Sequence, residues 1–106
     1  MLAGRIGARV RWCVTDRTGG RSRPPYDGLN LALHVGDDPG HVLANRREAA
    51  LAFGVDPGRL VQMAPVHGHA VAVVAGPQEQ AVADVDGLVT AVPGLALVAM
   101  AADCVP

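Results

Sequence analysis

Apolar and polar residues alternate between Ala8 and Thr15, in the stretch "ARVRWCVT". A period of two is typical of a β-strand with one buried face, so the pattern predicts a strand over residues 8–15. The segment that follows, "DRTGGRSRPPYDGLN", is rich in Gly, Pro, Ser, Asp and Asn. These residue types favour turns, and the segment therefore predicts one long loop. Long ordered loops are uncommon and often carry function.

A helix is predicted within "GDDPGHVLANRREAALAFGVD". Asp37 or Asp38 can accept the free N–H groups at the helix start, Pro39 suits the first turn, and Gly54 suits the end. One face of this helix, at a spacing of 3.6 residues, carries Val42, Arg46, Ala49, Ala50 and Phe53. Arg46 is the polar interruption of that otherwise apolar face.

Several β-like segments follow the helix. They are "LVQMAPV", "HAVAVVA", "DGLVT" and "GLALVAMAA". Their Val-rich and nearly continuous apolar runs are typical of strands that are covered on both faces. One helix cannot cover both faces of such a sheet, so we expect this chain to be part of a larger folded unit. The fold class indicated is mixed α and β.

Length, charge and cysteine content exclude several classes of protein. The chain has 106 residues, which predicts one domain at most, and its net charge of -1 gives no electrostatic case for nucleic acid or an anionic membrane. No apolar stretch reaches the ~18 residues of a membrane span, and arginines interrupt the N-terminal segment, which argues against a signal peptide. Two cysteines are too few for a disulfide framework. These features predict a cytoplasmic protein.

Histidine and cysteine supply the candidate chemistry. The four histidines include His67 and His69, which would point to the same face if their segment were extended. Together with a distant Cys they form a candidate transition-metal set, because imidazole and thiolate suit zinc or copper. The alternative is that they are surface or hydrogen-bonded histidines. Cys104 follows Asp103 at the end of an apolar run, and its alternative is a small buried hydrophobic residue.

Five motifs, read in order, resemble one known family. They are "RTGGRSRPPYDGLNLALHVGDDP", Asn45–Arg46, Val66–Gly68, Asp86–Thr90 and Ala102–Pro106. Their order and approximate spacing resemble the laccase-domain family, long labelled multicopper polyphenol oxidoreductases and now understood as zinc-dependent purine nucleoside enzymes. The resemblance runs from about Thr15 to the last residue.

The resemblance implies an activity and a metal site. Family members carry out phosphorolysis of purine nucleosides and also deaminate adenosine. They hold one metal with the His of a Val-His-Gly motif, the Cys of an Ala-Asp-Cys motif and a second His. Carried over, the first two ligands are His67 and Cys104. The second His belongs to a His-Ala-Gly-Trp-Arg-Gly motif that lies after Ala-Asp-Cys and is absent from this chain.

The resemblance also implies an architecture. The family fold is an α+β sandwich of four layers in the order helix, sheet, sheet, helix. On that basis residues 1–106 are expected to be the N-terminal part of a single laccase-type domain. The remainder of the domain, or a second chain, would then supply the missing ligand.

Phosphorolysis requires groups that bind phosphate oxygens. The resemblance makes purine nucleoside and phosphate the expected partners, and we predict Arg46 and Asn45 as catalytic residues. The predicted substrate or phosphate contacts are Arg17, Ser22 and Asn30. Arg46 has an alternative role as a packed stem with its head in solvent, and Asn30 as a turn cap. The family usually has Gln where this chain has Pro65, and proline cannot make the amide contact of a glutamine.

Two other readings remain open. A copper polyphenol oxidase is the older label of the family, but it would need several coppers and more ligands than four histidines and two cysteines provide. An inert or merely binding fragment is the other reading. Two ligands should hold zinc far more weakly than a complete site. We therefore expect the isolated chain to lack the phosphorylase activity of a longer parent.

Overall fold

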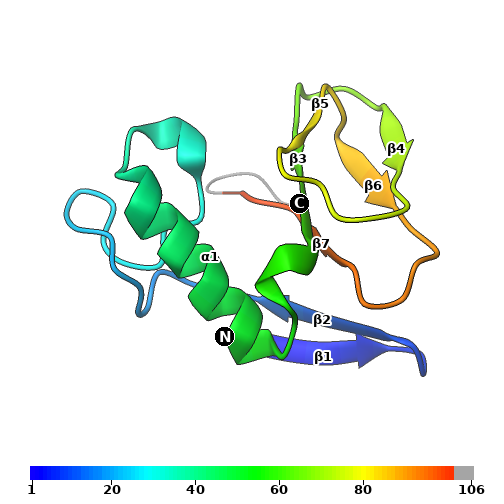
Figure 1. Cartoon of the computed structure of the whole chain (residues 1–106), viewed down its shortest axis with the longest axis horizontal. Helices are drawn as coiled ribbons and strands as arrows, with labels where there is room; N and C mark the ends of the chain where they lie inside the picture. The colour runs from blue at the N-terminus through cyan, green and yellow to red at the C-terminus, as the bar shows by residue number, and fades with distance from the viewer. Residues whose placement is uncertain (102–106) are drawn as a thin grey trace. The chain divides into compact units, whose positions relative to one another are not determined.

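The computed structural model describes residues 1–101. Contacts divide the chain into two compact units, one from Met1 to Gly54 and one from Val55 onward. Each unit is described by itself below. The mixed α and β composition predicted from the sequence is confirmed (Figure 1). The single domain and the four-layer order stay predictions.

The first unit opens with a β-hairpin. Strand β1 (Leu2–Ile6) pairs antiparallel with strand β2 (Val10–Val14), side by side in Figure 1. Strand β2 confirms the predicted strand, whereas β1 was not predicted because Gly4 and Arg5 interrupt its apolar pattern. Trp12 lies opposite Gly4, and a Cβ atom at Gly4 would be 2.7 Å from the indole ring. The aromatic ring therefore occupies the space that a side chain at Gly4 would need.

Helix α1 (Pro39–Phe53) follows the long loop and a short 3₁₀ helix, η1 (Leu33–Val35). The Asp38 side chain accepts the Gly40 N–H at 2.7 Å, which satisfies a free donor at the helix start. Gly54 ends the helix with φ of +81°, a conformation that glycine adopts without a steric penalty. The predicted helix and both of its ends are confirmed.

One face of α1 is buried. Val42 and Ala50, two of the predicted face residues, are buried, while Ala49, Arg46 and Phe53 are half-buried. At the last turn, the Arg11 guanidinium lies 4.8 Å from the centre of the Phe53 ring and donates to the Phe53 carbonyl at 3.2 Å. This contact ties the end of the helix to strand β2.

The second unit contains the remaining strands and a short 3₁₀ helix. The 3₁₀ helix is η2 (Pro57–Arg59), and the strands are β3 (Leu60–Ala64), β4 (Val71–Val73), β5 (Val82–Ala83), β6 (Gly87–Val89) and β7 (Ala96–Val98). Strand β3 lies between β5 and β7, parallel to both, and β4 pairs in parallel with β6. The predicted strands are confirmed, although β7 is shorter than its apolar run. The two-residue strand β5 was not predicted.

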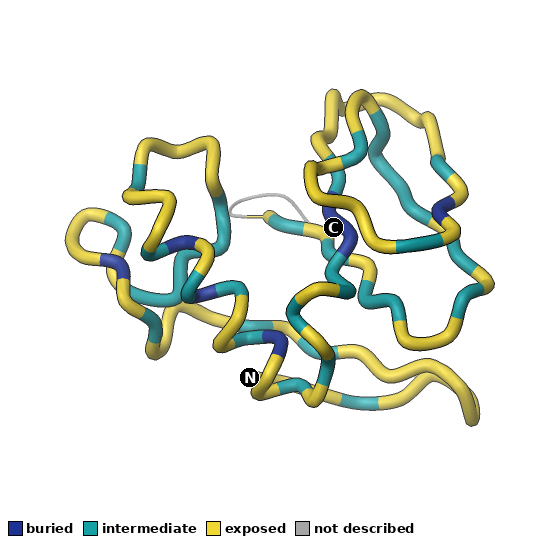
Figure 2. The backbone as a smooth tube through the Cα atoms, viewed as in Figure 1, coloured by how far each residue is buried: buried dark blue, intermediate teal, exposed yellow. Residues whose placement is uncertain are grey.

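Burial in the second unit is uneven (Figure 2). Val61 of β3 is fully buried, whereas Val71 and Val73 of β4 are 60% and 81% exposed. Strands covered on both faces were expected, and for β4 the described residues do not bear this out. The reason is that the described part of this unit contains no α-helix that could lie over the sheet. Nor does any helix in residues 1–101 combine the length and apolar character needed to cross a bilayer.

Candidate functional site

The predicted metal ligand His67 lies in a turn between strands β3 and β4. The carboxylate of Asp86 holds this turn by accepting hydrogen bonds from the backbone N–H groups of the turn. Asp86 Oδ1 accepts the His67 N–H at 2.9 Å, and Oδ2 accepts the N–H groups of Gly68 at 2.9 Å and Val66 at 3.3 Å. In return, the Asp86 N–H donates to the Ala70 carbonyl at 3.0 Å. The turn and the residue before β6 therefore hold each other.

The His67 backbone does not continue the strand. Its φ is +60°, in the left-handed region that is uncommon for a residue other than glycine. The prediction that His67 and His69 share a strand face assumed an extended segment, and that assumption is wrong. Alternation of side chains holds only for extended backbone, and the left-handed residue breaks it.

The donor chemistry at this turn fits zinc as far as the described residues go. The His67 residue is exposed, and a neutral imidazole is among the ligands zinc prefers. Within residues 1–101, no three His, Cys, Asp or Glu side chains are grouped closely enough to hold a metal ion. Cys104, the second predicted ligand, lies outside the described residues. The structure therefore places one predicted ligand and leaves the ligand set a prediction.

Asp86 is a residue whose role sequence reasoning missed. The "DGLVT" motif was used only for its resemblance to the family. An acidic residue directly before a predicted strand could also have indicated a side chain that holds a neighbouring turn. The N–H donated by Gly68, with those of Val66 and His67, lowers the pKa of the Asp86 carboxyl below its ordinary value. Asp86 is thus an anion whose hydrogen-bonding partners are backbone groups of the turn.

A second polar cluster lies in the first unit and centres on Asn45 of α1, which is fully buried. Its Nδ2 group donates to the Ser22 hydroxyl at 2.9 Å and to the carbonyls of Gly28 and Asn30 at 3.2 and 2.9 Å. Its Oδ1 atom accepts the Arg21 N–H at 2.7 Å. The helix thereby supplies hydrogen bonds to a loop that has no strand partner.

Asp37 completes this cluster. Its Oδ2 atom accepts a hydrogen bond from the Ser22 hydroxyl and another from Asn30 Nδ2, the latter at 3.0 Å, and its Oδ1 atom accepts the Asp38 N–H at 2.7 Å. The Ser22 hydroxyl, followed by the Asn30 amide, lowers the pKa of Asp37. Sequence reasoning treated Asp37 only as a helix-capping candidate. The structure thus brings the predicted residues Asn45, Ser22 and Asn30 together, with Asp37 among them.

The two predicted arginines bond to loop carbonyls. Arg46 is half-buried and its Nε donates to the Leu31 carbonyl at 2.9 Å, while burial lowers the pKa of its guanidinium. Arg17 Nε and Nη2 donate to the Asp27 carbonyl at 3.3 and 3.1 Å. These bonds anchor both side chains to the loop. Contact of Arg17 or Arg46 with a substrate stays a prediction.

The loop also approaches α1 closely at Gly20. The Gly20 N–H donates to Glu48 Oε2 at 3.1 Å. With φ of +78° at Gly20, a Cβ atom there would lie 2.6 Å from the Leu29 Cα and 2.8 Å from Asn45 Oδ1. Glycine at this position is therefore required by both conformation and space.

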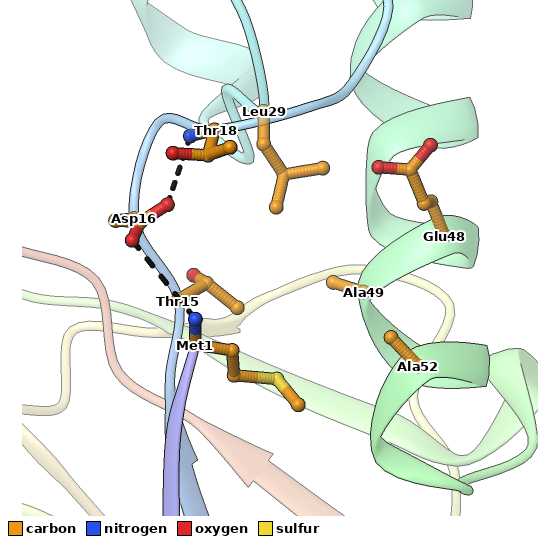
Figure 3. Close-up of a pocket in the computed structure, with 8 residues that line it drawn as sticks. All are labelled: Met1, Thr15, Asp16, Thr18, Leu29, Glu48, Ala49 and Ala52. Atoms are coloured by element: carbon orange, nitrogen blue, oxygen red, sulfur yellow. Dashed lines mark hydrogen bonds and ion pairs between the residues drawn. The ribbon is translucent and has the colours of Figure 1, made fainter.

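A small cavity of about 190 Å³ lies in the first unit (Figure 3). Glu48, Ala49 and Ala52 line it from α1, opposite the residue before β1 and residues of the segment that follows β2. Those opposite residues are Met1, Thr15, Asp16, Thr18 and Leu29. Asp16 accepts the Thr18 N–H at 2.9 Å and lies 4.0 Å from the terminal amine. The lining of this cavity includes none of the predicted site residues.

Residues 11–106 match the family described as multi-copper polyphenol oxidoreductase laccase. A relative from Mycobacterium tuberculosis, named purine nucleoside phosphorylase, is 50% identical over 103 residues, which cover 97% of this chain and 41% of the relative. A Streptomyces coelicolor relative with the same enzyme name is 57% identical over 93 residues, covering 87% of this chain and 38% of the relative. The chain thus spans about two fifths of the length of these curated relatives.

Two solved structures resemble this one. The crystal structure of YlmD from Geobacillus stearothermophilus superimposes with a TM-score of 0.73 at 36% identity, covering 76% of this chain and 33% of that one. That of the Bacillus licheniformis hypothetical protein YfiH gives a TM-score of 0.70 at 31% identity, with the same coverage. The mixed α and β fold is therefore shared with both proteins.

Asn45→Leu should destabilise the first unit. Leucine has nearly the same shape, but it leaves the Arg21 N–H and the buried acceptors of the loop without their partner, at about 1–3 kcal/mol for each group that stays unsatisfied. We expect a loss on the order of 3 kcal/mol in the free energy of unfolding, measured by urea titration of the helical circular dichroism signal. Arg47→Leu, at an exposed position on the same helix, is the control and should stay within about 0.5 kcal/mol. Equal stability of Asn45→Leu and wild type would contradict the role given to this amide.

The lowered pKa of Asp37 predicts a pH dependence of stability. Because the folded pKa lies below its ordinary value of 3.8, the contribution is present above that value and is lost as the pH falls through the lowered pKa. The urea midpoint of wild type should therefore drop in acid, and Asp37→Asn should reduce the drop. Part of it should persist, because the Thr18 N–H also lowers the pKa of Asp16. Identical acid profiles for the two proteins would rule out this role of Asp37.

Proposed function

Because this chain belongs to the family of multi-copper polyphenol oxidoreductase laccase domains, we propose that it forms part of a zinc-dependent purine nucleoside phosphorylase that also deaminates adenosine. The observation that carries the proposal is the pair of relatives at 50% and 57% identity, both named purine nucleoside phosphorylase. The proposed substrates are a purine nucleoside and inorganic phosphate.

His67 is the residue that we assign to the metal, together with Cys104. The turn held by Asp86 presents the His67 ring at an exposed position, where a metal and a substrate could reach it. When bound, zinc would supply a Lewis acid that stabilises negative charge as it develops in the reaction. The role of the chain is to hold the imidazole at the position where the metal binds.

Arg46 is the proposed phosphate contact. Among the described residues its guanidinium uses only Nε, on the Leu31 carbonyl, so its two Nη groups remain available to an anion. Two parallel N–H donors match two phosphate oxygens. The bond to Leu31 and the half-buried stem would limit the freedom of the side chain before substrate binds. Asn45, Ser22, Asn30 and Arg17 support this proposal indirectly, because they shape the loop beside the arginine.

Copper oxidase chemistry is the second candidate because the family description names it. Multicopper sites need several histidines close together. Among residues 1–101, no three His, Cys, Asp or Glu side chains are grouped closely enough to hold a metal ion. The proposed ligands His67 and Cys104 would serve one metal ion rather than a cluster. Oxidation of a phenol by the copper-loaded protein is the measurement that separates the two candidates.

The proposed function can be tested in a chimera, because the chain spans only part of its relatives. Residues 1–106 would replace the matching segment of the Streptomyces coelicolor relative, and release of hypoxanthine from inosine would be followed with and without phosphate. We expect phosphate-dependent release. His67→Ala should lower kcat/KM by more than the roughly 10–100-fold typical of losing a residue that only supports a ligand.

The matched control is His69→Ala, which removes the neighbouring exposed imidazole and should leave the rate near that of the unsubstituted chimera. The intact relative and a circular dichroism spectrum check that the chimera is folded. Adenosine incubated without phosphate should yield inosine if the deaminase activity is also present. A folded chimera that oxidises phenols with copper and releases no base from inosine would overturn the proposal.

A further inference from the structure

Three consecutive N–H groups, those of Val66, His67 and Gly68, converge on one carboxylate. Successive N–H groups that point into one concavity form an anion-binding nest. In many proteins such a nest receives an external anion. Here the chain fills it with its own anion, Asp86, from a position 18 to 20 residues further along. The hydrogen bonds of this nest therefore serve the conformation of the turn rather than the capture of phosphate.

The conformation of the turn needs such support. His67 has a left-handed backbone with φ of +60°, which is unfavourable for a residue that carries a Cβ atom. The turn has no strand partner, since β3 ends at Ala64 and β4 begins at Val71. A backbone held in a sparsely populated region persists only when its surroundings determine it. In the described chain, the three bonds to Asp86 are the hydrogen bonds that fix residues 66–68.

The pairing of β4 with β6 fixes the position of Asp86 itself. Val71 of β4 lies opposite Gly87 of β6 in a parallel pair, so the residues before them, Ala70 and Asp86, meet at the same edge. The Asp86 N–H donates to the Ala70 carbonyl at 3.0 Å. The carboxylate thus starts from a backbone position that the sheet already determines, and it transmits that position to the turn.

We propose that Asp86 is the positioning residue for His67: its carboxylate fixes the backbone of the Val66–Gly68 turn and thereby the direction in which the imidazole meets a metal ion. Among residues 1–101 the Asp86 carboxylate hydrogen-bonds to backbone N–H groups only, so we assign it to the turn and not to the metal. The inference rests on the proposed function in one respect, because it takes His67 as a zinc ligand. Without Asp86, metal binding would itself have to order the turn, and the free energy needed for this would weaken the metal affinity.

The test compares Asp86→Asn with Asp84→Asn in the 106-residue chain. Both variants remove one negative charge from the same segment, but Asp84 is exposed and its carboxylate bonds to no described residue. Zn²⁺ is titrated into each chain, its dissociation constant is measured by isothermal titration calorimetry, and the ring resonances of His67, where present, are followed by NMR. Amide exchange of residues 66–68 is measured separately in the absence of metal.

We expect Asp86→Asn to raise the apparent Zn²⁺ dissociation constant about 10–100-fold and to speed amide exchange at His67 and Gly68. Asparagine offers one acceptor oxygen and places an NH₂ group against the N–H donors, so it cannot replace the carboxylate. Asp84→Asn should stay within about twofold of wild type. Asp86→Glu keeps the charge but displaces the carboxylate by one methylene, and we expect an affinity between those of wild type and Asp86→Asn.

Two results would overturn the proposal. One is a folded Asp86→Asn chain that binds Zn²⁺ as tightly as wild type, and the other is equal weakening by Asp84→Asn, which would indicate charge alone. If Asp86→Asn does not fold, wild type still provides a test, because amides of His67 and Gly68 that exchange as fast as an open loop would also overturn it. His67→Ala separates this inference from the proposed function: unchanged Zn²⁺ binding in that variant rejects the ligand role, whereas the exchange data still report on Asp86.

Discussion

Backbone N–H and C=O groups outside regular secondary structure must find hydrogen-bond partners, and this constraint shapes both parts of the chain that carry predicted site residues. In the first unit the buried amide of Asn45 and the carboxylate of Asp37 serve the long loop. In the second unit the carboxylate of Asp86 serves the turn that contains His67. Side chains in regular elements or next to them therefore hold each irregular segment, two for the loop and one for the turn.

These polar contacts are important because the apolar cores of the two units are small. The buried apolar residues among the described ones are Val42, Ala50, Val61 and Val74. Valines such as Val73 remain largely exposed. Polar anchors at defined positions therefore carry much of the specificity with which the loop and the turn are held. A buried amide with satisfied partners determines one arrangement, because other arrangements leave its partners unpaired.

Local signals in the sequence were sufficient for much of the fold. Asp38, Pro39 and Gly54 marked both ends of α1, and the alternating and Val-rich runs marked most strands. The signals failed where a partner lay far away in the sequence. Strand β1, whose Gly4 lies against the ring of Trp12 on the partner strand, carries no such local signal.

The candidate site likewise has features that local sequence signals indicate and features that depend on distant partners. Its residue types and the family could be predicted from five motifs. The left-handed backbone of His67 and the convergence of three N–H groups on Asp86 could not, because both follow from the pairing of β4 with β6. Asn45 was selected as a catalytic candidate, but its hydrogen bonds to Ser22 and Asn30 show how it holds the loop. No local pattern distinguishes those two roles.

The central claim is that His67 binds zinc together with Cys104. X-ray absorption of the zinc-loaded chain measures the ligands directly. We predict imidazole nitrogen at about 2.0–2.1 Å and one sulfur at about 2.3 Å, with the imidazole signal lost in His67→Ala and the sulfur retained. A spectrum with only oxygen neighbours, or one that His67→Ala leaves unchanged, would contradict the claim.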